Sequence, residues 1–274
     1  MSSTPFDLAA GTEEFYFDAD YYDYEFKSRK DDVNWYVQRY VDAVGPVLEL
    51  GVGSGRIALP AVRKGAHVTG IDLSETMLEQ AEKHRARIAK SKRKSLVLHH
   101  DDMRTFELDQ KFDVVSIPFN AFMHLYTIED VDRCLTQVRR HLVDDGQLLV
   151  DVLIPDLDYL TRSPFKKYEG ITFTHPTFKE KYRYSEQSAY NPLTQINQMW
   201  FFYDRIEKQG KGPESFCIQL SHRCFFPQEM RRILTGHGFE VEETYGDFNA
   251  GELRSDNESI AFVCRKMPGL GLEA

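Results

Sequence analysis

Three glycines at alternate positions follow an acidic residue in the stretch VLELGVGSGR, residues 47–56. Glycine gives the backbone conformations that other residues avoid, and it lets a ligand approach the chain closely. Where such a loop joins a strand to a helix, the N–H groups of the helix terminus also face the ligand. Gly51, Gly53 and Gly55 therefore predict a nucleotide-like cofactor at the carboxyl edge of a sheet.

The spacing of these glycines weakens an assignment to a nicotinamide dinucleotide. That fingerprint requires G-x-G-x-x-G, whereas the sixth position counted from Gly51 is Arg56. Glu49 stands shortly before the first glycine, and its carboxylate would repel a pyrophosphate but attract an ammonium group. We therefore expect a positively charged cofactor, and an NAD-linked oxidoreductase remains as a weaker alternative.

Acids and polar residues end the next predicted strands. Asp72, in GIDLS, is placed like the acid that accepts hydrogen bonds from ribose hydroxyls in doubly wound folds, so it predicts an adenosine. In HHDDMR, Asp102 is expected to accept from an adenine amino group and Met103 to cover the ring. In IPFNAFMHL, Pro118 and Asn120 are expected to line the floor near the reacting end.

This ordered series of strand-end motifs resembles the class I S-adenosylmethionine-dependent methyltransferases, over about 47–153 and the closing strands. The resemblance implies S-adenosylmethionine (SAM) as cofactor and S-adenosylhomocysteine (SAH) as product. By that family's pattern Glu49 and the glycine loop hold the methionine part, Asp72 the ribose, and Asp102 with Met103 the adenine. The residues expected to contact the cofactor are Tyr21, Arg29, Trp35, Glu49, Gly51, Gly53, Gly55, Asp72, Leu73, Met77, Asp102, Met103, Pro118 and Asn120.

Methyl transfer from a sulfonium depends mainly on placing acceptor and methyl group together. An amine or hydroxyl acceptor must also lose a proton, and histidine is suited to accept it near neutral pH. His124, in NAFMHL, is the predicted base, and this run resembles the sugar N-methyltransferases of bacterial antibiotic pathways, where a His in this loop faces the acceptor. The alternative is a capping or core-rim histidine. Tyr22 is the second catalytic candidate, and His99 and His100 are expected to be structural.

The stretch EFYFDADYYDYEFKSRKDDVNWYVQRY, before the first predicted strand, holds six Tyr, three Phe and one Trp. Aromatic faces stabilise a cation and exclude water, so this segment is expected to form a lid whose contacts are Tyr16, Tyr21, Tyr22 and Trp35. The alternative is that its aromatic residues only pack onto the sheet. Arg29 is a candidate partner for the cofactor carboxylate, because a guanidinium matches a carboxylate bidentately.

Short apolar runs alternate with longer amphipathic stretches from residue 47 to about 152, the pattern of βα units and a parallel sheet. The predicted fold class is α/β: a Rossmann-like, seven-stranded, mostly parallel sheet with an antiparallel last strand and helices on both faces, plus an antiparallel β insert. The expected strands are 47–51, 66–72, 95–100, 112–118 and 146–153, and the expected helices lie near 55–64, 75–90, 121–126 and 129–142.

The rhythm changes after Pro155 to long strands rich in aromatic and β-branched residues, and Pro227 then begins a last helix. The expected organisation is an N-terminal helical lid (1–44), a SAM-binding core (45–154), an antiparallel β insert over the acceptor (155–226), the last helix and closing strands (227–266) and a tail (267–274).

Insert strands cover the active site in glycine and sugar N-methyltransferase-like proteins, so this resemblance implies an acceptor pocket in the insert, and we also expect a homodimer contact there. In an alternating strand Trp200 and Phe202 share one face, while Met199, Phe201 and Tyr203 share the other. One face is expected to be core and the other pocket or dimer contact. The acceptor-binding candidates are Tyr16, His124, Trp200, Tyr203 and Arg223.

The charge balance disfavours nucleic acid as a partner. The 274 residues include 34 Lys+Arg and 43 Asp+Glu, and the net charge of -9 would repel a phosphate backbone. The basic run KHRARIAKSKRK, at 83–94, contains no aromatic residues and is expected to be a solvated helix face and loop.

The four cysteines lack C-x-x-C spacing, so neither a zinc site nor a disulfide framework is indicated. No trio of acids indicates another metal. The N-terminal stretch lacks a signal-peptide pattern, and no apolar run approaches the ~20 residues that span a bilayer. We therefore expect a cytoplasmic protein without a membrane partner.

The sequence favours methyl transfer to a nitrogen of a small metabolite. Two alternatives stay open: a metal-independent O-methyltransferase of a small metabolite, and a nonenzymatic SAM-binding protein. The identity of the acceptor is not encoded in any motif.

Overall fold

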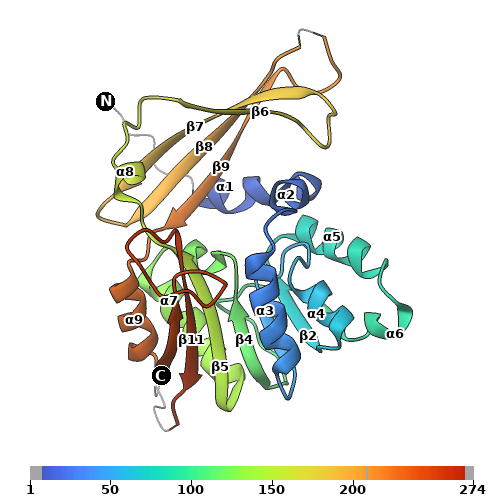
Figure 1. Ribbon diagram of the computed structural model, residues 1–274, viewed down its shortest axis with the longest axis vertical. Helices are drawn as coiled ribbons and strands as arrows, with labels where there is room; N and C mark the ends of the chain where they lie inside the picture. Colours follow the sequence, from blue (N-terminus) through green and yellow to red (C-terminus); the bar gives the residue numbers. More distant parts are fainter. Residues whose placement is uncertain (1–7, 208, 269–274) are drawn as a thin grey trace. The chain divides into compact units, whose positions relative to one another are not determined.

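The computed structural model describes residues 8–207 and 209–268, which form two compact units (Figure 1). One unit combines the described residues up to Lys27 with Asp156–Cys224, and the other combines Ser28–Pro155 with the described residues from Phe225 onward. We call them the insert unit and the core unit. Most of the predicted tail, 269–274, lies outside the described residues, as do residues 1–7 of the predicted lid and Lys208 of the predicted insert.

The core unit is built on a seven-stranded sheet in the order β10-β11-β5-β4-β1-β2-β3. The five strands from β1 to β5 pair in parallel, and β11 runs antiparallel to both of its neighbours. This confirms the predicted fold class. The strands are β1 Val47–Leu50, β2 Val68–Asp72, β3 Leu96–His100, β4 Phe112–Ile117, β5 Leu142–Leu153, β10 Phe239–Tyr245 and β11 Ser259–Lys266.

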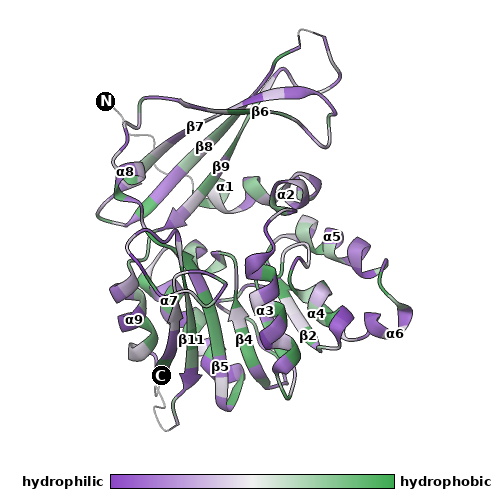
Figure 2. Cartoon of the chain, viewed as in Figure 1, coloured by the Kyte–Doolittle hydropathy of each residue, from purple (hydrophilic) through white to green (hydrophobic). Residues whose placement is uncertain are grey.

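Helices cover both faces of this sheet, because successive strand residues point to opposite sides. Leu48 and Leu50 share one apolar core with α7 and α9, while Val47 belongs to a second core with α3, α4 and α5. Long parts of β4, β5 and β11 carry the hydrophobic colour in Figure 2. The helices are α3 Asp31–Asp42, α4 Ala58–Lys64, α5 Glu75–Arg85, α6 Lys90–Arg93, η2 Ala121–His124, α7 Ile128–His141 and α9 Pro227–Gly236.

Two expected helices differ from the structure. The helix predicted over 75–90 ends at Arg85, and the short helix α6 that follows it has no buried residue. The helix predicted over 121–126 is a single 3-10 turn that ends at His124. Leu125 adopts an extended conformation (φ -87°, ψ 95°), which ends the 3-10 turn.

The insert unit is built on a four-stranded antiparallel sheet in the order β6-β7-β8-β9. The first aromatic stretch of the insert is divided between β6 and β7, because the His175 N–H donates to the Glu180 carbonyl and closes a turn between them. The strands are β6 Tyr168–Thr174, β7 Lys181–Asn191, β8 Ile196–Arg205 and β9 Ser215–Arg223, and the helices are α1 Leu8–Glu13, η1 Glu14–Tyr16, α2 Ala19–Phe26 and α8 Leu157–Leu160.

The alternation predicted for β8 is present. Met199, Phe201 and Tyr203 lie in the aromatic core of the insert unit, whereas Trp200 and Phe202 are only half-buried on the opposite face. That core also receives Tyr21 from α2.

The segment predicted as a single lid, 1–44, is divided between the two units after Lys27. Asp18 caps α2 and also accepts a hydrogen bond from Thr177, and Glu14 accepts one from the backbone N–H of Gln219, 205 residues away (2.8 Å). These contacts tie the first helices to the four-stranded sheet. The amphipathic helix α3 instead packs into a core of the seven-stranded sheet.

None of the helices in residues 8–207 and 209–268 is long and apolar enough to cross a membrane.

Thr127 and Asp130 form a capping box at the start of α7. The Thr127 hydroxyl accepts from the N–H of Asp130 (3.0 Å), and the Asp130 carboxylate accepts from the N–H of Thr127 (3.2 Å). We expect Thr127→Ala to lower the free energy of unfolding by about 1 kcal/mol, measured by urea denaturation. Thr127→Ser retains the hydroxyl and serves as the control. Equal stability of the Ala and Ser variants would contradict the role of the cap.

Candidate cofactor site

The predicted motifs meet at the carboxyl ends of the parallel strands. From β1 the chain passes to β2 and β3 on one side, then returns to β4 and β5 on the other side. The order therefore reverses between β1 and β4, and loops that leave neighbouring strands at such a switch point diverge and create a ligand-binding crevice. The glycine loop follows β1, and Pro118 and Asn120 follow β4.

The three glycines of the loop all have positive φ angles: 75° at Gly51, 54° at Gly53 and 81° at Gly55. A Cβ added at Gly51 would lie 2.8 Å from the Cβ of Ala121, in the loop region after β4. A Cβ at Gly53 would lie 3.2 Å from the end of the Met77 side chain on α5. The loop thus needs glycine both for its backbone conformation and for its close approach to its neighbours.

Asp72, at the end of β2, holds this loop. One carboxylate oxygen accepts from the N–H of Gly53 (2.6 Å), and the other accepts from the N–H of Ser74 (2.8 Å). Burial raises the pKa of Asp72, and these backbone hydrogen bonds oppose the rise. Each carboxylate oxygen has a further lone pair, so the group retains the capacity to accept from hydroxyls of a ligand.

Glu49 is the most unusual acid of the site. It lies in the middle of β1 with 1% of its surface exposed, and its Oε2 atom has no hydrogen-bond partner among the described residues. Burial raises the pKa of Glu49 to about 8, although a hydrogen bond with Tyr40 and the positive charge of Arg56 lower it. A buried acceptor without a donor is costly, so this oxygen fits a ligand that brings an N–H group or a positive charge.

The loop after β4 contains two successive non-glycine residues with positive φ, 55° at Phe119 and 65° at Asn120. Both of their N–H groups donate to Asp151 on β5, at 2.7 and 3.2 Å, and the Tyr36 hydroxyl donates to the same carboxylate at 2.6 Å. Burial raises the pKa of Asp151 to about 6, and these three hydrogen bonds lower it.

Two guanidinium groups lie over the ring of Phe119, Arg56 at 4.2 Å and Arg29 at 5.5 Å from its centroid. Arg56 also forms a bidentate ion pair with the buried Asp32 of α3. Arg29 is exposed. Its proposed pairing with the cofactor carboxylate stays a prediction, but its position beside the loop after β4 is compatible with that role.

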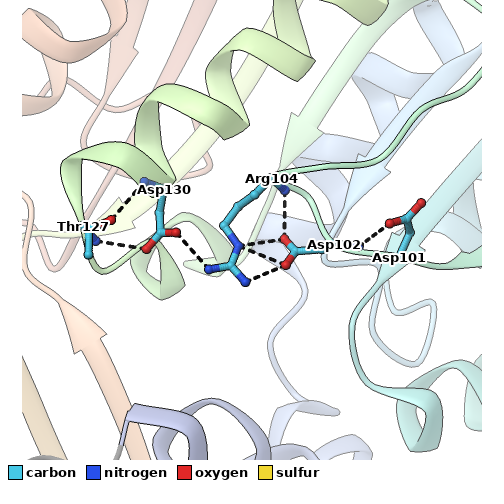
Figure 3. A network of polar contacts seen from close by, with 5 residues as sticks. All are labelled: Asp101, Asp102, Arg104, Thr127 and Asp130. Carbon is cyan, nitrogen blue, oxygen red and sulfur yellow. Dashed lines mark hydrogen bonds and ion pairs between the residues drawn. The ribbon is translucent and has the colours of Figure 1, made fainter.

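The loop after β3 contains a network of charged hydrogen bonds (Figure 3). Arg104 donates through Nε and Nη2 to both oxygens of Asp102, at 2.9 and 2.6 Å, and through Nη1 to Asp130, at 2.9 Å. Although burial raises it, these contacts with Arg104 hold the pKa of Asp102 below its ordinary value. The predicted adenine acceptor is therefore held ionised, and it is connected to the capping box of α7.

His124 ends the 3-10 turn after β4, where its Nδ1 atom lies 3.2 Å from the Tyr126 hydroxyl. Burial lowers the pKa of His124 to about 4, so its imidazole is neutral at neutral pH. A neutral imidazole has one nitrogen able to accept a proton.

The remaining cofactor candidates of the core unit occupy different environments. Leu73 is half exposed, Met77 is buried beneath the glycine loop, and Met103 is partly buried against the core. Trp35 is only 5% exposed and packs edge-on to Tyr36, with the Arg39 guanidinium 3.5 Å from its ring centroid. Its role as a cofactor contact stays a prediction.

The other candidates belong to the insert unit. Tyr21 stacks on His175, with centroids 4.9 Å apart, and the Tyr203 hydroxyl donates to its hydroxyl at 3.3 Å. Tyr16 and Tyr22 contact each other through their rings. Trp200 lies on the half-buried face of β8, and Arg223, at the end of β9, is buried. Their predicted lid, catalytic and acceptor-binding roles stay predictions.

Five residues that support this site were missed from the sequence. They connect elements that are distant along the chain, and only the placement of an acid within the apolar run LLVDVL signals one of them. The missed residues are Asp32, Tyr36, Tyr40, Arg104 and Asp151.

Comparisons with known proteins agree with this geometry. A family model described as a methyltransferase domain matches residues 47–146. The Bacillus subtilis protein YqeM, named as a methyltransferase, is 30% identical over 227 residues, which are 81% of this chain and 84% of that protein. The glycine/sarcosine N-methyltransferase of Aphanothece halophytica is 24% identical over 80% of this chain and 76% of its own length. The CcbJ methyltransferase structure from Streptomyces caelestis has a TM-score of 0.78 at 22% identity, and covers 96% of this chain and 100% of that one.

The chain therefore belongs to the class I SAM-dependent methyltransferases. The residues fit this cofactor, because Glu49 offers a buried oxygen that has no donor among the described residues, and the three glycines of the loop hold positive φ angles beside it. When bound, SAM supplies an electrophilic methyl group on a sulfonium. Among residues 8–207 and 209–268, no cluster of three His, Cys, Asp or Glu residues could hold a metal ion.

The network around Arg104 should give the protein an acid-sensitive component of stability. The contacts with Arg104 depress the pKa values of Asp102 and Asp130 below 3.8, although burial opposes this. Their contribution is therefore present above that pH and is lost as the pH falls through the lower folded-state values. We expect Arg104→Ala to be less stable than the wild type at about pH 6, and the difference to shrink toward about pH 3.

Urea denaturation at several pH values measures this difference. Arg104→Lys, which retains a charge but not the bidentate geometry, should give an intermediate result. A gap between Arg104→Ala and the wild type that is constant with pH would contradict this expectation.

Proposed function

We propose that this enzyme methylates a nitrogen atom of a small-molecule metabolite, with SAH as the second product. The observation that carries the proposal is the neutral His124 on the loop after β4, next to the switch point of the sheet. An amine or hydroxyl acceptor must give up a proton in the course of methylation, and this imidazole is in the form that accepts one. The similarity to a glycine/sarcosine N-methyltransferase over 80% of this chain favours nitrogen over oxygen as the acceptor atom.

Three acidic residues of the core unit would bind different parts of the cofactor. Glu49 would receive the amino group of the methionine part, Asp72 would accept from the ribose hydroxyls, and Asp102 would accept from the adenine amino group. Asp72 also keeps the glycine loop in place, through the hydrogen bond that it accepts from Gly53. Catalysis then depends chiefly on holding the acceptor nitrogen in line with the methyl group, since proximity and orientation supply much of the rate.

The pKa of His124 limits its role. A base is most effective when its pKa lies near the operating pH, and a pKa of about 4 means that a transferred proton is held weakly. His124 would therefore accept a hydrogen bond from the acceptor, orient its lone pair, and pass the proton on to solvent.

Methyl transfer from radiolabelled SAM to a panel of amines, amino acids, aminosugars, phenols and carboxylates tests the proposal. Transfer to amino compounds supports it. Transfer confined to phenols or carboxylates would favour an O-methyltransferase, and no transfer to any acceptor, with SAH binding retained, would favour a nonenzymatic SAM-binding protein. Chelators are expected to leave the activity unchanged, because no metal-binding cluster occurs within residues 8–207 and 209–268.

SAH binding should release a proton from Glu49. The carboxyl group is mostly protonated at neutral pH, since its pKa is about 8, and a nearby ammonium would lower that value. We expect close to one proton to be released at about pH 7. Calorimetry in buffers with different ionisation enthalpies measures this number. Glu49→Gln should bind more weakly and release almost none, and an unchanged release from that variant would assign the proton to another group.

His124→Ala should lower kcat by about 10²-fold, the low end for general acid–base catalysis, and change SAH affinity by less than about twofold. Because the pKa of His124 is about 4, the rate profile should show no inflection near pH 6.5 from this residue. Steady-state kinetics across pH, together with calorimetry, check both statements. An unchanged kcat would reject the role of His124.

A further inference from the structure

Asp151 is an acid placed where an apolar residue would be expected. It lies near the end of β5, in the run LLVDVL, with 2% of its surface exposed. Its strand neighbour on β11 is Ala261, and the flanking Leu149 belongs to the same apolar core as α3. A carboxylate in such surroundings is retained only where hydrogen bonds offset the loss of solvent.

Those hydrogen bonds come from two elements of the core unit. Tyr36 donates from α3, and the N–H groups of Phe119 and Asn120 donate from the loop after β4. Both carboxylate oxygens are used, because Phe119 and Tyr36 donate to Oδ1 and Asn120 donates to Oδ2. One side chain therefore joins β5, α3 and the β4 loop.

The loop that it holds is strained. Positive φ is uncommon outside glycine and is a clear outlier for a bulky residue such as Phe119. Such conformations persist where the surroundings impose them, and they concentrate at functional sites. The Oδ1 atom of Asn120 is buried without a hydrogen-bond partner among the described residues, and the next residue, Ala121, lies against Gly51.

We propose that Asp151 is a positioning residue for cofactor binding: its carboxylate imposes the left-handed conformation of Phe119 and Asn120 and thereby sets the loop against the glycine cradle. The proposal rests on the cofactor site assigned above. Asp151 itself acts through the loop. In the ionised form it accepts all three hydrogen bonds, whereas in the protonated form one oxygen carries a hydrogen and faces a donor.

The pH dependence follows from the groups that face Asp151. Tyr36 and Asp32 face it from α3, and Tyr40 lies one turn further along the same helix. Asp32 forms an ion pair with Arg56, which balances its negative charge. Burial raises the pKa of Asp151 to about 6. The ionised form required by the loop is thus lost below about pH 6, and SAH affinity should fall there.

The free energy of unfolding should change with pH in the opposite direction to SAH affinity. The folded-state pKa of Asp151 is raised above the ordinary value of 3.8, so its contribution to folding is full below that pH and is lost as the pH rises through about 6. A purely structural carboxylate would not link weaker cofactor binding to higher stability over the same pH interval.

The test measures SAH affinity by calorimetry for the wild type, Asp151→Asn and Tyr36→Phe. Asn retains one acceptor oxygen but turns an amide N–H group toward a backbone donor, so we expect the Kd for SAH to rise about tenfold at pH 7.5. Tyr36→Phe leaves both backbone hydrogen bonds in place and should raise it about two- to threefold. In the wild type, the plot of log Kd against pH should become steeper below about pH 6, beyond the slope that Glu49 contributes, and Asp151→Asn should lack this break.

A rescue separates positioning from simple loss of stability. Glycine adopts positive φ without strain, so Asp151→Asn combined with Phe119→Gly should fold and recover SAH affinity relative to Asp151→Asn alone. If Asp151→Asn does not fold, this double variant is compared with Phe119→Gly, and the two should bind within about threefold. An Asp151→Asn Kd within twofold of the wild type, or a double variant with no recovery, would overturn the proposal. SAH binding involves no acceptor, so either result is independent of whether the enzyme methylates nitrogen.

Discussion

The candidate cofactor site depends most on the two hydrogen bonds that the Asp72 carboxylate accepts. This carboxylate joins the loop after β1 to the loop after β2, because its two oxygens accept N–H groups from Gly53 and Ser74. Three left-handed glycines cannot hold one conformation by themselves, since glycine loses more freedom on folding than any other residue. The short hydrogen bond from the Gly53 N–H to the partly buried Asp72 restricts that freedom and favours one loop conformation.

Burial and neighbours give the acids around this cradle different protonation states. Burial raises the pKa of Glu49 to about 8 in spite of its partners, and it raises that of Asp151 to about 6, where three hydrogen bonds oppose it. Asp102 is held ionised by Arg104, although burial again opposes this. Carboxyl side chains therefore provide a proton-bearing group, a titrating group and a fixed negative charge at one edge of a sheet.

Local patterns in the sequence predicted the fold class, the strand ends and the glycine loop, because alternation, glycine spacing and strand-end acids depend on residues close together in the chain. The supporting network escaped prediction because its partners are far apart: Tyr36 and Asp151 are separated by 115 residues, and Arg104 and Asp130 by 26. The split of the N-terminal segment after Lys27 was missed for the same reason. The aromatic residues of this segment indicate that it is buried, but they do not indicate in which of the two units.

The insert unit is discontinuous in sequence, and this has a consequence for biosynthesis. Glu14 accepts a hydrogen bond from the backbone of Gln219, 205 residues later. The helices α1 and α2 therefore cannot pack on the four-stranded sheet until the intervening chain has been synthesised. At bacterial and eukaryotic translation rates this delay is roughly 10–40 s. Throughout that interval the tyrosines and phenylalanines of the first segment have no β8 or β9 to cover them. The insert unit can therefore complete its fold only after β9 has been synthesised.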